Sequence, residues 1–146
     1  MRRGGESFMK PVFSTPIRVY YEDTDAGAVV FYANYLKFME RARTEWLRSL
    51  GFEQDELSRH EGVIFAVHSA KLDFLKPARF NDLLQATVQL RHRGAASLTF
   101  AQQVQRDNVV LCDAEIKIAC LDVATFAPRP FPEKIKIRLE AAGGSA

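Results

Sequence analysis

A single amphipathic helical segment, followed by a series of strand-like runs, is the feature that most constrains how this chain folds. Apolar side chains recur at the spacing of one face of an α-helix at Tyr35, Phe38, Met39, Ala42 and Trp46. A candidate cap precedes this stripe and a glycine follows it, which predicts a helix over about residues 33–50. At 1.5 Å per residue such a helix is roughly 25 Å long.

The rest of the chain follows a different period. After Gly62, apolar and polar residues alternate, as they do in strands that have one face buried. The pattern predicts strands over residues 13–21, 63–74, 84–90, 97–105 and 109–122. Turns are expected at residues 91–95 and 107–108, and shorter helices at 54–60 and 133–140.

This order of elements predicts an α+β fold, with an antiparallel sheet of about five strands wrapped around one long helix. A helix of roughly 25 Å covers only part of a sheet that wide. We therefore expect a second subunit to bury the remaining apolar face.

Length and charge limit the classes of function. The 146 residues suit one domain spanning residues 1–146, with disordered ends at 1–9 and 141–146. A net charge of +2 does not favour a general nucleic-acid binder. We find neither a secretory signal nor an apolar run long enough for a transmembrane segment, so a cytoplasmic location is expected. Cys112 and Cys120, eight residues apart in one expected strand, would lie about 26 Å apart as reduced thiols.

The loop between the first expected strand and the helix holds the candidate chemistry. Asp23, Asp25 and Gly27 lie there, just before the helix start. Backbone N–H groups at a helix start carry partial positive charge and polarise a carbonyl, while a nearby aspartate acts as a general base or a nucleophile. Aspartate and glycine in such a loop also serve simply as turn and cap residues.

The same segment resembles the active-site motif of the 4-hydroxybenzoyl-CoA thioesterase family, in which Asp-x-Asp precedes small, apolar and aromatic residues and then x-Asn-Tyr. Within that family the chain is most similar to the Tol-Pal-associated acyl-CoA thioesterases. The runs that carry the resemblance are residues 18–27, 40–45, 77–79 and 96–100, and overall it covers about residues 16–134.

The resemblance implies a hot-dog fold and an acyl-CoA thioesterase that needs no cofactor. It makes Asp25 the catalytic carboxylate and Asp23 its structural support, and it puts the N–H groups of Tyr32 and Ala33 on the thioester carbonyl. It also implies a homo-oligomer, a dimer at least and a tetramer by expectation. The chain departs from the subfamily in having Tyr32 where histidine is frequent and Ala28 where glycine is usual.

Several other polar residues could have either a functional or a structural role. Glu40 is a candidate second acid, but pairing with Arg43 or Arg41 is the simpler expectation. Arg91 and Arg93, with help from Arg129, are candidates for binding the CoA phosphates, or they belong to an ordinary solvated turn. The three histidines have no metal-ligand spacing, so no metal is predicted, and Ser97 lacks a nucleophile motif.

Two other functions compete with thioester hydrolysis. A hot-dog hydratase would resemble an Asp-x4-His pattern, but Val30 stands five residues after Asp25. A non-catalytic module that binds acyl-CoA or acyl-carrier protein is the main alternative. The sequence does not identify the acyl group. Four aromatic residues could line a substrate pocket, but the core is the simpler expectation for each of them: Phe31, Phe65, Phe74 and Phe80.

Overall fold

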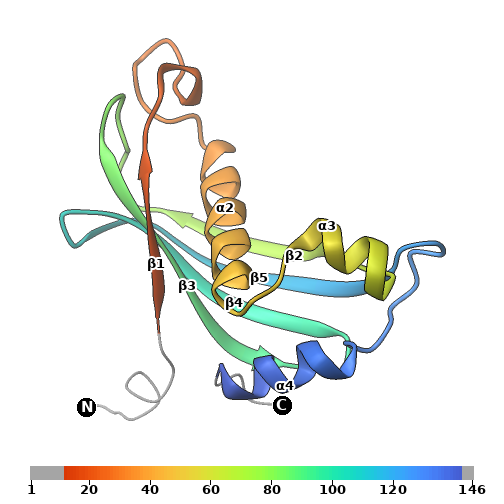
Figure 1. The fold of residues 1–146 in the computed structure, drawn as a ribbon. Helices are drawn as coiled ribbons and strands as arrows, with labels where there is room; N and C mark the ends of the chain where they lie inside the picture. Colours follow the sequence, from red (N-terminus) through yellow and green to blue (C-terminus); the bar gives the residue numbers. More distant parts are fainter. Residues whose placement is uncertain (1–11, 143–146) are drawn as a thin grey trace.

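The computed structural model describes residues 12–142, which form one curved five-stranded antiparallel sheet and a long helix (Figure 1). The strands follow the order β1-β3-β4-β5-β2 across the sheet. Their bounds are β1 Phe13–Arg18, β2 Val63–Phe74, β3 Leu83–Arg93, β4 Ser97–Arg106 and β5 Val109–Asp122. The predicted α+β hot-dog architecture is confirmed.

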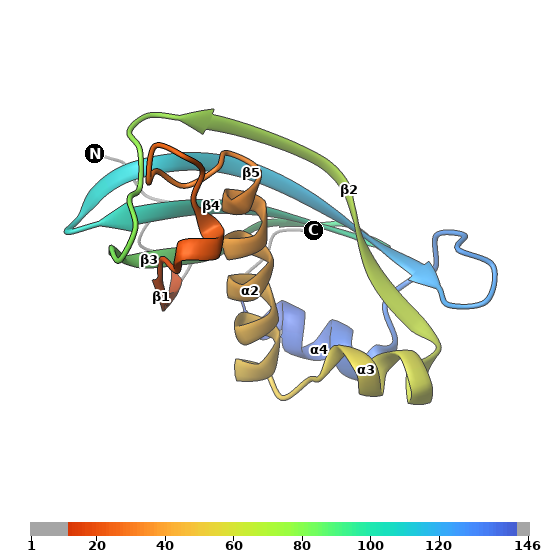
Figure 2. The same cartoon turned by 90° about the horizontal axis from the view of Figure 1, so that it is seen from above.

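Helix α2, Asn34–Ser49, lies across the concave face of the sheet and packs on β1, β3 and β4 (Figure 2). Its predicted apolar stripe is the buried face: Phe38, Met39 and Ala42 have no exposed surface. Trp46 meets Phe100 of β4 edge-to-face, with ring centroids 5.2 Å apart. The stripe therefore forms the layer between helix and sheet.

Two predicted boundaries are wrong. The first strand stops at Arg18, and residues 21–23 form a short 3-10 turn (η1, Tyr21–Asp23), because the N–H of Tyr20 donates to the carboxylate of Asp23 and leaves the ladder. The expected turn at 91–95 is shorter, because β3 runs to Arg93 and stays paired with β4 through a bulge after Leu90.

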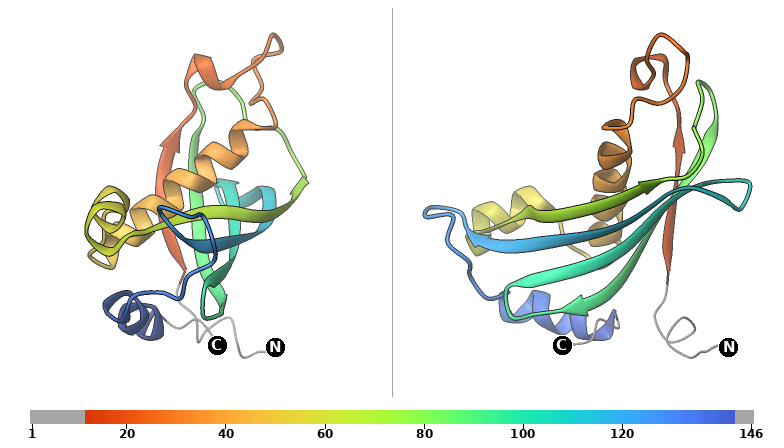
Figure 3. Two further views of the ribbon diagram at one scale, coloured as in Figure 1. Left: turned by 90° about the vertical axis from the view of Figure 1, so that its right-hand side faces the viewer. Right: turned by 180° about the vertical axis from the view of Figure 1, so that it is seen from behind.

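The shorter helices are present where they were predicted. Helix α3, Gln54–Glu56, continues into a further turn, η2, Leu57–Glu61. Helix α4, Glu133–Ala141, closes the far end of the sheet and buries Ile135 and Leu139 (Figure 3). The expected disorder at 141–146 is wrong for Ala141 and Ala142, which end this helix; residues 1–9 and 143–146 lie outside the described part of the chain.

The two cysteines are free and buried in β5, as expected from their spacing. Burial raises the pKa of Cys112 to about 12 and that of Cys120 to about 11. Both thiols therefore stay protonated at neutral pH and behave as small apolar side chains.

One polar side chain connects the helix to the sheet from inside. Gln102 of β4 has no exposed surface. Its Nε2 donates to the carbonyl oxygens of Met39 and Thr87, both at 3.1 Å, and its Oε1 accepts from Nη1 of Arg43 at 2.9 Å. This one amide joins α2, β3 and β4, so its hydrogen bonds fix the position of α2 on the sheet.

We predict that Gln102→Met, which keeps the volume, lowers the free energy of unfolding by about 1–3 kcal/mol, because it leaves the Arg43 guanidinium and a buried carbonyl unpaired. Urea unfolding followed by circular dichroism measures the loss. The matched control is Gln103→Met on the opposite face of β4, where we expect a change within about 0.5 kcal/mol. Equal effects of the two variants would contradict this role for Gln102.

Candidate active site

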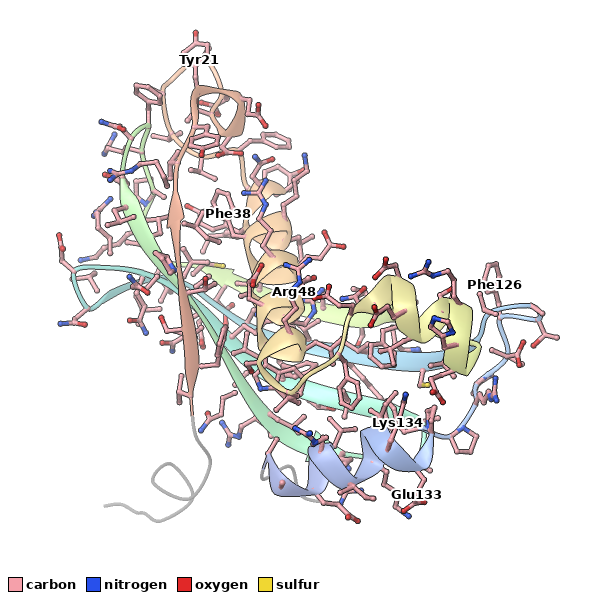
Figure 4. The ribbon with its side chains drawn as sticks, viewed as in Figure 1. Tyr21, Phe38, Arg48, Phe126, Glu133 and Lys134 are labelled. Carbon is pink, nitrogen blue, oxygen red and sulfur yellow. The ribbon has the colours of Figure 1, made fainter. Side chains whose placement is uncertain are left out.

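The loop between β1 and α2 folds back on itself at one end of the sheet, where Tyr21 marks its tip (Figure 4). Thr24 and Val30 form an antiparallel bridge, and Val29 bridges to Arg79 in the segment before β3. The N–H of Phe80 donates to the carbonyl of Ala28 at 3.0 Å. Backbone hydrogen bonds thus hold the loop to itself and to its neighbouring segment.

Asp23 is the buried brace of this loop. It is 3% exposed. Its Oδ2 accepts from the N–H of Tyr20 at 2.8 Å, and its Oδ1 accepts from Nδ2 of Asn34 at 2.9 Å. Since Asn34 is the first residue of α2, one carboxylate ties the end of β1 to the helix start.

Asp25 is exposed and lies in a tight turn. Its Oδ1 accepts from the N–H of Gly27 at 2.9 Å, and its backbone bonds to Val29 and Ala28. A Cβ at Gly27 would lie 3.4 Å from Oδ1, at an ordinary contact distance. Within residues 12–142 no donor reaches Oδ2, which leaves one oxygen of Asp25 open to solvent.

The start of α2 offers free backbone donors. Asn34 donates its N–H to the carbonyl of Phe31 at 2.8 Å, and Tyr35 donates to Tyr32 at 3.3 Å. The N–H groups of Tyr32 and Ala33 have no backbone acceptor in the described chain. Free N–H groups at a helix start carry partial positive charge and stabilise negative charge on an oxygen.

Arg91 and Arg93 lie at the other end of β3 from this loop. Arg18, the last residue of β1, pairs with Leu83, and Arg91 is eight residues further on, about 26 Å along the strand. Arg91 lines a polar depression on the sheet face away from α2, while Arg93 reaches Glu140 of α4 at 3.9 Å. The fold therefore does not bring these arginines to Asp25 within one chain.

Arg129 lies away from the loop as well, where Nη1 donates to the carbonyl of Gly62 and lies 3.4 Å from the Asp122 carboxylate. The predicted pairing of Glu40 is wrong: among residues 12–142, no ion pair joins it to Arg41 or Arg43. Arg43 turns inward to Gln102, where burial lowers the pKa of its guanidinium and the nearby Glu40 partly opposes that shift.

The aromatic candidates divide between surface and core. Phe65 is half-buried and packs against the core. Phe31, Phe74 and Phe80 are 45–51% exposed, so the expectation that they belong to the core is wrong for these three. Tyr32 contacts both Phe31 and Phe74, with ring centroids 4.7 and 6.0 Å apart. An exposed aromatic cluster thus borders the helix start.

No group of three or more potential metal ligands occurs among residues 12–142. In the same part of the chain, no helix is long and apolar enough to cross a membrane.

Comparison with known proteins shows the family to which this sequence belongs. A model of the thioesterase-like superfamily matches residues 19–139. The chain belongs to that superfamily. The chain is 42% identical over 124 residues to an acyl-CoA thioesterase YbgC from Haemophilus influenzae, covering 85% of this chain and 91% of that protein. The same identity extends over 125 residues of an acyl-CoA thioester hydrolase YbgC from Escherichia coli, covering 85% and 92%.

Solved structures agree on the fold. A probable thioesterase from Bartonella henselae matches with a TM-score of 0.80 and 31% identity, over 84% of this chain and all of that one. A hypothetical protein from Thermus thermophilus matches with a TM-score of 0.84 and 28% identity, over 90% and 98% of the two chains. The family resemblance inferred from the sequence motifs is confirmed.

Ala28 adopts a left-handed conformation, with φ of 61°, at the position where the resembling subfamily usually has glycine. This conformation costs a residue with a Cβ about 1–2 kcal/mol. We predict that Ala28→Gly is neutral to stabilising by up to about 1 kcal/mol, because glycine relieves that strain but loses more entropy on folding.

Thermal unfolding measures this change. The matched control is Ala26→Gly in the same exposed loop, where φ is not positive. There we expect a loss of about 0.4–1 kcal/mol, because only the entropy of the unfolded chain changes. Equal losses in both variants would contradict a strained loop at Ala28.

Proposed function

We propose that this chain hydrolyses acyl-CoA thioesters to a free acid and CoA. The observation that carries the proposal is that one loop holds both an exposed carboxylate and free backbone donors. Asp25 accepts from the N–H of Gly27, and further along the same loop the N–H groups of Tyr32 and Ala33 have no backbone acceptor within residues 12–142. The names of the relatives from Haemophilus influenzae and Escherichia coli support the same substrate class.

In the proposed reaction the thioester oxygen accepts from the N–H groups of Tyr32 and Ala33, which stabilise the oxyanion as it forms. Asp25 takes a proton from the attacking water, or attacks the carbonyl carbon itself to form an anhydride that water then opens. In both routes the C–S bond breaks and the CoA thiolate leaves and is protonated. Asp23 contributes by fixing the loop to α2.

We predict that Asp25→Asn lowers kcat by about 10²-fold or more, the scale of losing a general base. The amide oxygen still accepts from Gly27, so the fold and the binding of acyl-CoA should be retained. A thiol-detecting assay on acyl-CoA measures turnover, and calorimetry measures binding. Activity within about threefold of the wild type would exclude Asp25 and make Glu40 the next candidate.

The matched control is Asp23→Asn. It changes the same group two residues away, but there both carboxylate oxygens accept a hydrogen bond, and the amide nitrogen that replaces one of them cannot accept. We expect a loss of about 1–3 kcal/mol in stability and a smaller loss in kcat than for Asp25→Asn. If the wild type binds acyl-CoA and never turns it over, the chain is a binding module instead.

We further propose that Arg91 and Arg93 bind the phosphates of a CoA molecule whose thioester lies in the loop of a neighbouring subunit. Within one chain these arginines lie about 26 Å along β3 from the loop, so they cannot serve their own site. Replacing both with alanine should raise KM more than it lowers kcat, because phosphate contacts exist in the ground and transition states alike. Glu140→Ala is the control, since it breaks the Arg93 ion pair but keeps both arginines. An unchanged KM in the double variant would refute this site.

A neighbouring subunit is proposed for a second reason. Strand β2 is an edge of the sheet, and its residues 67–71 are exposed. A long open edge pairs readily with another chain. We propose a dimer at least, with a tetramer expected, in which β2 and the aromatic cluster of Phe31, Tyr32 and Phe74 are covered.

We predict a mass of at least twice the 16.5 kDa of one chain by light scattering at micromolar concentration. Ala70→Lys, in the middle of the exposed part of β2, should reduce that mass, since a long charged side chain blocks edge pairing. Ala124→Lys, in the exposed turn after β5, should leave it unchanged. A wild-type monomer would contradict the proposal.

A further inference from the structure

A cavity of about 270 Å³ opens between α2 and the strands β2, β4 and β5. Its size is just below the usual range of small-molecule sites, roughly 300–1,000 Å³. The apolar walls consist of Trp46, Leu47, Phe65, Leu98, Phe100 and Ile118. Such walls suit the hydrocarbon part of an acyl group.

Arg43 adds a directed polar group to this lining. Its one hydrogen bond within the described chain runs from Nη1 to Gln102, and no carboxylate of residues 12–142 forms an ion pair with it. A guanidinium has five N–H donors, and a desolvated charge is costly unless acceptors meet it. The hydrogen bond to Gln102 uses one of these donors. The remaining N–H groups of Arg43 are therefore available to a ligand in the cavity.

Gln102 also fixes where this guanidinium lies. Its own amide is held by the carbonyl oxygens of Met39 and Thr87 and has no exposed surface. Arg43 is therefore placed by a rigid partner, as a group that recognises a ligand must be. Glu40 also lines the cavity but is exposed, so its charge stays hydrated.

One helix face connects this cavity to the proposed reaction centre. Leu36, Glu40 and Arg43 follow one another at spacings of four and three residues, which puts them on one side of α2, and Tyr32 lies in the turn that leads into this helix. Arg43 lies about 14 Å along the axis from the helix start at Asn34. An acyl group whose thioester is at that start can run along this face toward Arg43.

We propose that this cavity binds the acyl group, and that Arg43 selects acyl groups carrying an acceptor oxygen, a hydroxyl or a carboxylate, remote from the thioester. This inference rests on the proposed thioesterase function. A site built to donate to a substrate oxygen discriminates strongly against the analogue without it, because its donors are then left unpaired.

The test compares three CoA thioesters of equal chain length that end in a methyl group (decanoyl), a hydroxyl group (10-hydroxydecanoyl) or a carboxylate (decanedioyl), because about ten carbons are needed to span the distance of about 14 Å from the helix start to Arg43. We expect kcat/KM for at least one oxygen-bearing substrate to exceed that for decanoyl-CoA by about tenfold or more. Which of the two is favoured identifies the acceptor as hydroxyl or carboxylate. Equal kcat/KM values for all three substrates would overturn the proposal.

The variant Arg43→Met keeps an unbranched side chain and removes its donors. It should lower kcat/KM for the favoured oxygen-bearing substrate to that of the methyl-ended one, and so abolish the preference. The matched control is Arg41→Met on the same helix, because Arg41 stacks over Phe38 and does not line the cavity. Should Arg43→Met not fold, Arg43→Lys, which keeps the charge with fewer donors, must still reduce the preference. An equal loss on all three substrates would mean that Arg43 only supports the fold.

A second readout separates this inference from the proposed activity. Trp46 is the one tryptophan of the chain and lines the cavity, so its fluorescence reports occupancy without turnover. Titrating the same three thioesters into Asp25→Asn should give an Arg43-dependent difference in affinity. If nothing is hydrolysed by the wild type but this difference persists, only the proposed activity fails. If hydrolysis proceeds and the difference is missing, only this inference fails.

Discussion

The packing of α2 into the concave face of the sheet is the constraint on which the rest of this structure depends. Phe38, Met39 and Ala42 are completely buried there, and Gln102 fixes the position of the helix from below. Burying a side chain of the size of Phe38 or Met39 is worth about 1.5–3 kcal/mol. Because the helix is held so firmly, the free N–H groups at its start are presented at a fixed place.

Asp23 connects that helix to the loop that carries the candidate chemistry. Its carboxylate meets Asn34 at the helix start and Tyr20 at the end of β1. Two aspartates two residues apart therefore have opposite environments: one is buried and fully used by the fold, and the other is exposed with one oxygen open. The buried one sets the position of the exposed one, so stability and proposed catalysis divide between them.

A buried polar group on the inner face of the sheet likewise supports the fold and positions a candidate functional residue. Gln102 is at a core-facing position of β4, where an apolar residue would pack without hydrogen bonds. Its presence orients Arg43, and the resulting guanidinium lines an otherwise apolar cavity. A polar residue that interrupts the apolar alternation of a strand was visible in the sequence as a signal, although its partners were not.

The sequence by itself determined the elements, because helical and alternating periods are local properties: α2, β2, β4, β5 and the hairpin turn at Asp107 and Asn108 lie where they were predicted. The motif around Asp25 likewise identified the loop and the family. Only the tertiary structure decided that Arg43 turns to Gln102 rather than Glu40, that three aromatic residues are exposed, and that Arg91 is at the far end of β3 from Asp25. Those contacts join residues far apart in the chain, so they depend on strand order and register, which no local pattern encodes.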